Sequence, residues 1–99
     1  MMNKEFKSIQ EFALWIKENS ELVGIFPLFG DFYAGYENLG RGCTCKRNAK
    51  LKTLQQIFFA TVQGLNNNTL AKEKFKKLAD ADKIIFNIQE LSEQKIEIQ

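Results

Sequence analysis

The segment Leu51–Leu65 reads LKTLQQIFFATVQGL and carries the clearest structural signal in the chain. Apolar residues and one threonine recur in it at steps of three and four, which is the spacing of one face of an α-helix. The members of this stripe are Leu51, Leu54, Phe58, Thr61, Val62 and Leu65. The sequence therefore predicts a core-facing helix over about residues 47–65.

Three further helices are expected around this segment, each from a local start or stop signal. Ser8 and Glu11 form a capping-box pattern, which marks the start of a helix. Pro27 breaks a helix that reaches it, and the run Asn66–Asn68 favours a helix end, after which Thr69 is the expected N-cap. The predicted helices cover about residues 8–19, 29–39 and 69–79.

The last twenty residues permit two interpretations. Apolar residues alternate within 84–88 and again within 96–98, which is typical of a β-hairpin. Ile84, Ile88 and Leu91 would equally form one face of a helix. The hairpin is favoured because β-branched residues dominate the first of the two segments. The expected fold is α+β, with three to four helices around one core and a small C-terminal β-hairpin, and the alternative is all-α.

The composition is that of an ordinary globular chain. With 99 residues, 44% of them hydrophobic and 26% charged, a single domain over residues 1–99 is expected. The net charge of +2 is too small to indicate nucleic acid by itself. Because no apolar run reaches the roughly 18 residues of a membrane span, and the N-terminus lacks a signal-peptide core, we expect a cytoplasmic protein without a membrane partner.

Nothing in the sequence indicates catalysis. The chain has no histidine, which removes the commonest general base and most catalytic zinc sites. It also lacks a P-loop, a dinucleotide-type glycine pattern and a calcium loop. Asp80 and Asp82 are paired carboxylates, but acids at a predicted helix end normally stay hydrated. We therefore expect a protein that is not an enzyme and that has no catalytic residues and no cofactor.

Aromatic residues are abundant in the first third of the chain. The chain has nine Phe, two Tyr and one Trp, and a core of this size is not expected to hide all of those between Trp15 and Tyr36. Because large exposed apolar patches usually mark interfaces, we expect an aromatic-rich surface that binds a protein partner or a second copy of the chain. For Trp15 itself, the favoured interpretation is a first helix that the domain covers on two sides, and the alternative is exposure to a partner. The predicted partner-binding residues are Trp15, Phe26, Phe29, Phe32, Tyr33 and Tyr36.

Cys43 and Cys45 form the only motif with chemical content, next to cations and a predicted helix start. Two cysteines supply half of a tetrahedral zinc shell, so a two-fold dimer would complete a four-thiolate site. A redox pair is a second interpretation, although the short ring of a Cys-x-Cys disulfide departs from preferred geometry. The third and favoured interpretation is a purely structural role at a tight turn.

A basic cluster surrounds these cysteines. Between Arg41 and Lys52 there are five positive charges and no acid. Such a cluster at a helix start can hold phosphates, although a solvated helix face is its commoner meaning. The alternative function is therefore a nucleic-acid-binding accessory protein, and the residues that would bind are Arg41, Lys46, Arg47 and Lys50.

At Gly42-Cys43-Thr44-Cys45-Lys46-Arg47, before a predicted helix, the chain resembles small uncharacterised proteins of tailed bacteriophages. These proteins often carry a Gly-Cys-x-Cys-Lys/Arg segment at such a place. The resemblance implies a phage accessory or virion-associated protein in the host bacterial cytoplasm or the virion. With the aromatic surplus, it makes a non-enzymatic binding or assembly module the expected function. A third hypothesis, from the acidic residues after Leu78, is an inhibitor that docks on a host enzyme.

Overall fold

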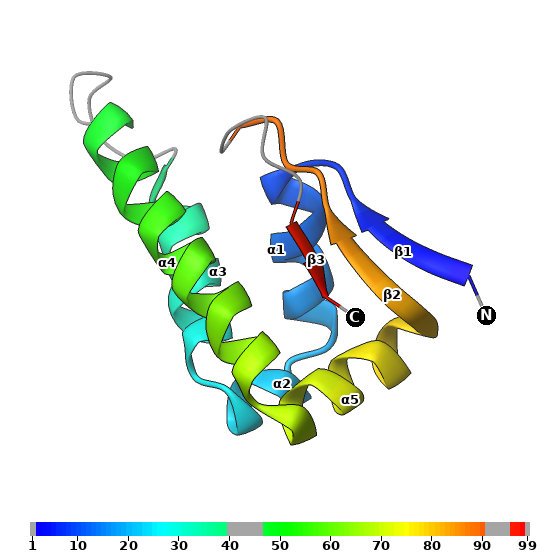
Figure 1. Ribbon diagram of the computed structural model, residues 1–99. Coiled ribbons are helices and arrows are strands. Elements are labelled where there is room, and N and C mark those ends of the chain that lie inside the picture. The colour runs from blue at the N-terminus through cyan, green and yellow to red at the C-terminus, as the bar shows by residue number, and fades with distance from the viewer. Residues whose placement is uncertain (1, 40–46, 91–95, 99) are drawn as a thin grey trace.

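The computed structural model describes residues 2–39, 47–90 and 96–98. Within these ranges, five α-helices and three β-strands follow one another along the chain (Figure 1). Their bounds are β1 (Met2–Phe6), α1 (Ile9–Glu18), α2 (Glu21–Ile25), α3 (Leu28–Leu39), α4 (Arg47–Asn67), α5 (Thr69–Ala79), β2 (Ala81–Phe86) and β3 (Ile96–Ile98). The expected α+β class is confirmed, and the helix count exceeds three to four because of the short α2.

The three strands form one sheet in the order β1-β2-β3. Strand β1 runs parallel to β2, with Phe6 beside Phe86, whereas β3 runs antiparallel to β2, with Ile98 beside Ile84. The expected C-terminal hairpin is thus present as the pair β2–β3. The parallel strand β1 was not predicted.

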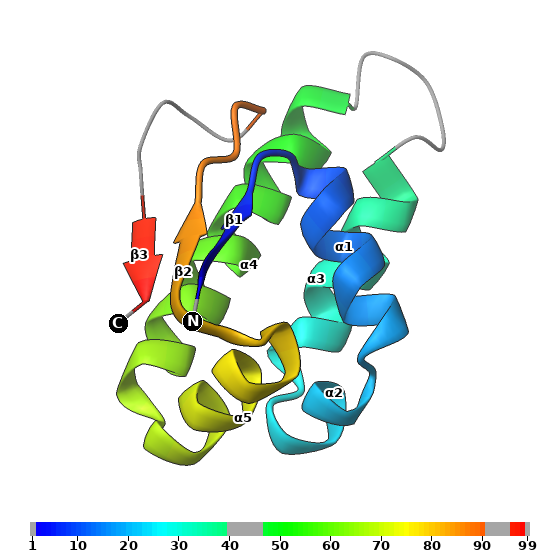
Figure 2. The ribbon, with the colours of Figure 1, turned by 90° about the vertical axis from the view of Figure 1, so that its right-hand side faces the viewer.

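The helices lie on one side of this sheet, and no described element covers its other side (Figures 1 and 2). On the uncovered side, Lys83 and Glu97 form an ion pair with an Nζ–Oε2 distance of 2.9 Å. Beside it, Asn87 Nδ2 donates a hydrogen bond of 3.3 Å to Glu5 Oε1. The sheet therefore has one polar face toward water and one apolar face toward the helices.

Phenylalanine rings fill the space between the sheet and the helices. The ring of Phe12 lies among six others, with centroid distances from 4.9 to 6.4 Å. The cluster consists of Phe6, Phe12, Phe29, Phe32, Phe58, Phe75 and Phe86, each at most 2% exposed. Seven of the nine Phe residues are thus core residues, whereas four of the six aromatic residues between Trp15 and Tyr36 are only half-buried. The core therefore hides part of that aromatic surplus and not all of it.

Helix α4 is the helix that the Leu51–Leu65 stripe predicted. The buried members of the stripe are Leu54, Phe58, Thr61, Val62 and Leu65, and Leu51 is half-buried. The Thr61 hydroxyl is satisfied inside the core because Oγ1 donates to the carbonyl oxygen of Ile57 at 2.7 Å. The amphipathic interpretation of this segment is therefore confirmed.

The predicted signals at the first helices are also confirmed. Ser8 Oγ accepts the backbone N–H of Glu11 at 3.1 Å, and Glu11 Oε2 accepts the backbone N–H of Lys7 at 2.6 Å. Pro27 separates α2 from α3. Helix α2 was not predicted, because its five residues are too few to show a helical period.

The cap of α5 is one residue earlier than predicted. Asn68 Oδ1 accepts the backbone N–H of Ala71 at 3.2 Å, and Thr69 is already helical. Because loss of an N-cap side chain costs about 1 kcal/mol, we expect Asn68→Ala to lower the free energy of unfolding by about that amount. Urea denaturation measures it. Thr69→Ala is the matched control and should cost much less, so equal losses would contradict this cap.

Candidate functional site

The predicted aromatic surface is largely part of the core. Phe29 and Phe32 are 0% exposed, so the prediction that they bind a partner is wrong. The reason is their place on α3, which brings their ring centroids to 6.1 and 5.0 Å from that of Phe12. The other predicted residues are half-buried and pack against the core, namely Trp15, Phe26, Tyr33 and Tyr36.

Trp15 and Phe26 serve mainly as packing residues. The Trp15 ring meets those of Phe75 and Phe6 edge-on, with centroid distances of 4.8 and 5.7 Å. The Phe26 ring lies directly over Gly64 of α4, where a Cβ atom would overlap it. Most of both rings is therefore unavailable to a partner.

Tyr33 is not poised for proton transfer. The pKa of Tyr33 lies above its ordinary value of 10.0. The largest cause is a hydrogen bond with the Glu37 carboxylate, and smaller causes are partial loss of hydration and repulsion from the same carboxylate. A phenol with a raised pKa stays protonated at neutral pH. This residue therefore offers no base or nucleophile.

The structure leaves the cysteine motif and most of the basic cluster untested. Arg47 begins α4, and Lys50 Nζ donates to the carbonyl oxygen of Asn38 near the end of α3 at 3.2 Å. In the described part of the chain, no group of three His, Cys, Asp or Glu side chains could hold a metal ion. The predicted site residues outside the described ranges are Arg41, Cys43, Cys45 and Lys46. The shared-zinc and nucleic-acid hypotheses stay predictions.

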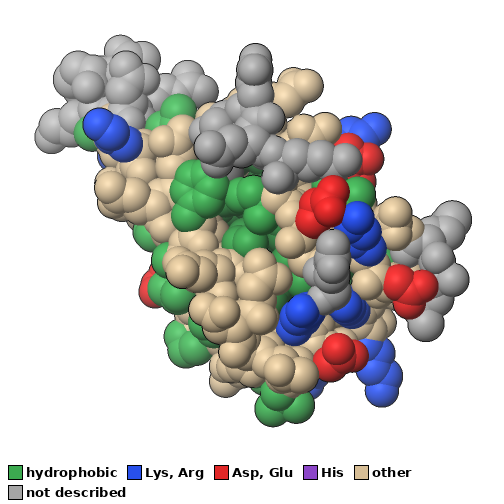
Figure 3. Space-filling model, in the orientation of Figure 1, with side chains coloured by type: hydrophobic (Ala, Val, Ile, Leu, Met, Phe, Trp, Pro, Cys, Tyr) green, Lys and Arg blue, Asp and Glu red, His purple; other side chains and the backbone are tan. Residues whose placement is uncertain are grey.

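The exposed side of α4 from residue 53 onward differs from the rest of the surface because it carries no charge. Residues 53–71 contain no Asp, Glu, Lys or Arg, in a chain of which 26% is charged. Figure 3 shows acidic and basic side chains gathered over the sheet and α5, whereas most of α4 is covered by hydrophobic and uncharged polar groups. We call the exposed residues of this run on α4 the uncharged α4 face: Thr53, Gln56, Phe59, Ala60, Gln63, Asn66 and Asn67.

A hollow of about 460 Å³ opens beside this face, toward β3. Its lining is formed by Phe59, Val62, Gln63, Asn66, Asn67 and Ile96. Phe59 is 38% exposed, and its ring packs edge-on against the buried ring of Phe58, with a centroid distance of 5.7 Å. The ring is held on a helix with amide groups around it, and none of the described residues that line the hollow is charged, which is the composition of the centre of a protein interface.

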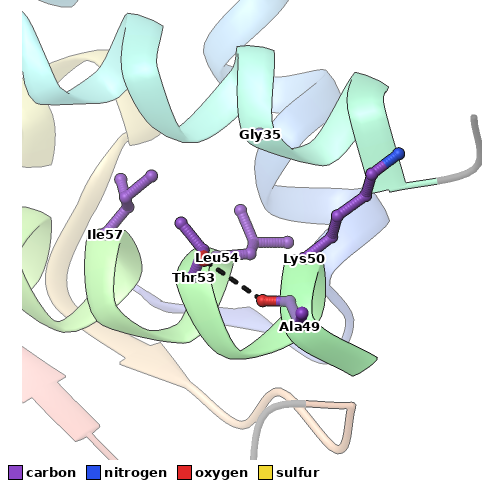
Figure 4. Close-up of a pocket in the computed structure, with 6 residues that line it drawn as sticks. All are labelled: Gly35, Ala49, Lys50, Thr53, Leu54 and Ile57. Carbon is purple, nitrogen blue, oxygen red and sulfur yellow. Dashed lines mark hydrogen bonds between the residues drawn. The ribbon is translucent and has the colours of Figure 1, made fainter. Parts of the chain in front are cut away.

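A second hollow, of about 300 Å³, lies on the other flank of α4, where α3 packs against it (Figure 4). It is lined by Gly35, Ala49, Lys50, Thr53, Leu54 and Ile57. A Cβ atom on Gly35 would lie 3.1 Å from the Leu54 side chain, so the glycine allows the two helices to approach closely. Thr53 Oγ1 donates to the carbonyl oxygen of Ala49 at 3.1 Å. Because this hydroxyl is already bonded within α4, the surface of the hollow is largely apolar.

The uncharged α4 face was not predicted, although its signal is present in the sequence. The interface was predicted from an excess of aromatic residues, whereas the informative feature is a lack of charge over residues 53–71. Interface centres are depleted in charged residues, so such a run on an exposed helix is a useful sign.

No protein-family model, curated protein or solved structure matches this chain. Among the residues that the structure describes, no helix is long and apolar enough to cross a membrane. The functional proposal therefore depends on the geometry and chemistry of the α4 surface.

Proposed function

We propose that this chain is a non-enzymatic binding or assembly module that docks on a protein through the uncharged α4 face. The observation that carries the proposal is the exposed ring of Phe59 on a helix face that has no charge over about four turns. The resemblance at Gly42–Arg47 adds a context, in which the partner is a protein of the phage or its host.

The chemistry of this face favours protein over nucleic acid. Phosphate groups are bound by Lys and Arg, and residues 53–71 have neither. Amide and hydroxyl groups can donate and accept hydrogen bonds to the polar rim of a protein partner, while Phe59 and the hollow beside it supply the apolar centre.

The exposed part of Phe59 is large enough to matter for binding. Covering 38% of a phenylalanine side chain removes about 75 Å² of apolar surface from water, which stabilises a complex by about 2 kcal/mol. Since 1.4 kcal/mol corresponds to a factor of ten, we expect Phe59→Ala to weaken binding more than about tenfold.

A photo-crosslinking amino acid at position 59 tests the proposal in cells that produce the full chain. The matched control carries the same group in place of Leu14, which is 43% exposed on α1 and thus more accessible than Phe59. We expect a discrete protein adduct from position 59 and none from position 14. The mass of the adduct identifies the partner as a second copy or another protein.

Two results would overturn the proposal. The first is the absence of an adduct from position 59. The second is the same set of adducts from positions 59 and 14, because this would indicate non-specific collisions.

A further inference from the structure

We propose that the partner of the uncharged α4 face is a second copy of the chain, whose α4 runs antiparallel to the first. This pairing rests on the proposed function, because it assigns an occupant to the same surface. Its support comes from the spacing, the self-complementarity and the charge distribution of α4.

The outermost residues of α4 follow the spacing of a helix–helix seam. Six exposed and uncharged residues succeed one another at alternating steps of four and three: Ala49, Thr53, Gln56, Ala60, Gln63 and Asn67. This alternation keeps a stripe in contact with a neighbouring helix that crosses at about 20°. Half of the stripe consists of Ala or Thr, whose small side chains permit a close approach of the two axes.

An antiparallel register centred on residue 58 makes this stripe complementary to itself. Each small residue then faces an amide side chain of the other copy. The facing pairs are Ala49 with Asn67, Thr53 with Gln63, and Ala60 with Gln56. In this register Gln63 can hydrogen-bond to the Thr53 hydroxyl of the other copy, while Gln56 and Asn67 face alanines, whose small side chains leave room for a bridging water. A stripe of like charges would instead repel an identical copy.

The same register pairs the apolar residues beside the stripe. Phe59 lies on the flank toward the β3 hollow, and Ile57 lies on the flank toward the α3 hollow. Since both are within one residue of the centre, each would meet its own copy across the two-fold axis. The exposed ring of Phe59 would thereby be covered by the Phe59 ring of the second copy.

The charges of α4 select the antiparallel orientation. Its three charged residues, Arg47, Lys50 and Lys52, are in the first six positions, where the helix dipole is itself positive. A parallel pair would place the exposed Lys52 near its own copy. The antiparallel pair places it near the negative C-terminal end of the other α4. Lys50 makes a similar contact within the chain, with the Asn38 carbonyl oxygen near the end of α3.

The available area fits a reversible dimer. Helix α4 has 21 residues and is about 31 Å long, and we take the contact to be about 20 Å wide, roughly two helix diameters, so that it includes the flanking hollows. The pair would bury about 1,200 Å² in total, which is near the lower limit for specific interfaces. We therefore expect a dimer that dissociates on dilution through the micromolar range.

Sedimentation equilibrium of the purified full chain tests this pairing. Reductant and chelator are present, so that a disulfide or a metal shared through Cys43 and Cys45 cannot hold two copies together. We expect the mass to rise from 11.4 kDa toward twice that value with increasing concentration.

Charged substitutions in the stripe test the register. Gln56→Lys and Ala60→Glu should each remain monomeric, because each buries an unpaired charge in the interface. An equimolar mixture of the two variants should dimerise again, since the register places the introduced lysine of one copy opposite the introduced glutamate of the other. Gln10→Lys, an exposed change on α1, is the matched control and should dimerise like the unmodified chain.

The outcomes separate this pairing from the proposed function. A chain that stays monomeric up to millimolar concentration overturns the pairing, and a specific adduct of position 59 with another protein would then still support the docking function. A dimer unaffected by Gln56→Lys and Ala60→Glu, or a dimer that forms only without chelator, also overturns the pairing. If each variant alone is monomeric and the equimolar mixture is also monomeric, the register centred on residue 58 is wrong.

Discussion

Phe12→Ala should lower the free energy of unfolding by about 3–5 kcal/mol. The side chain is 0% exposed and its ring lies among six other phenylalanine rings, so its removal leaves a cavity that the surrounding rings cannot fill. Because domains of this size are stable by only about 5–15 kcal/mol, the variant would lose a large part of its stability. Urea denaturation followed by circular dichroism measures the loss.

Phe12→Leu is the matched control for this cavity. Leucine keeps most of the apolar volume, so we expect it to cost roughly 1–2 kcal/mol, clearly less than alanine. A loss below about 1 kcal/mol for Phe12→Ala would contradict a core built around this ring.

Gly64→Val is expected to have the second-largest effect on stability. A Cβ atom at this position of α4 would overlap the Phe26 ring, which itself packs on Phe29 with a centroid distance of 5.4 Å. Such overpacking costs about 1–3 kcal/mol, and the branched side chain places the expected loss near the upper end. The measurement is the change in the free energy of unfolding in urea.

Two comparisons show whether the Phe26 ring is the cause of that loss. In a Phe26→Ala background, the same valine should be close to neutral, because the space above α4 is then free. Gly24→Val is the second comparison, since a Cβ atom at Gly24 meets nothing within 4 Å and should change stability by no more than about 0.5 kcal/mol. If Gly64→Val cost the same with and without the Phe26 ring, the contact would not be responsible.

Local patterns were sufficient to predict much of this fold. The stripe of α4, the capping box at Ser8 and the alternation at residues 84–88 each depend on neighbours a few positions away. Strand β1 was missed for the opposite reason. Its residues MNKEF show little alternation, and they are extended because they pair with β2, some eighty residues later.

The place of the aromatic rings could not be predicted from their number. Phe29 and Phe32 lie near Phe12 only because α3 packs against α1, which is a consequence of the tertiary fold. The uncharged α4 face is different, because its lack of charge is visible in the sequence. Its exposure is not visible there, since it depends on which side of α4 packs against the core.

A dilution series of ¹H–¹⁵N correlation spectra would test the α4 face residue by residue without any substitution. Contact between copies through this face predicts concentration-dependent shifts at the exposed residues of α4, strongest near Phe59 and Ala60, with little change in α1 and in the outer face of the sheet. Spectra that do not change with concentration would contradict this contact. So would shifts that centre on the sheet or on α5.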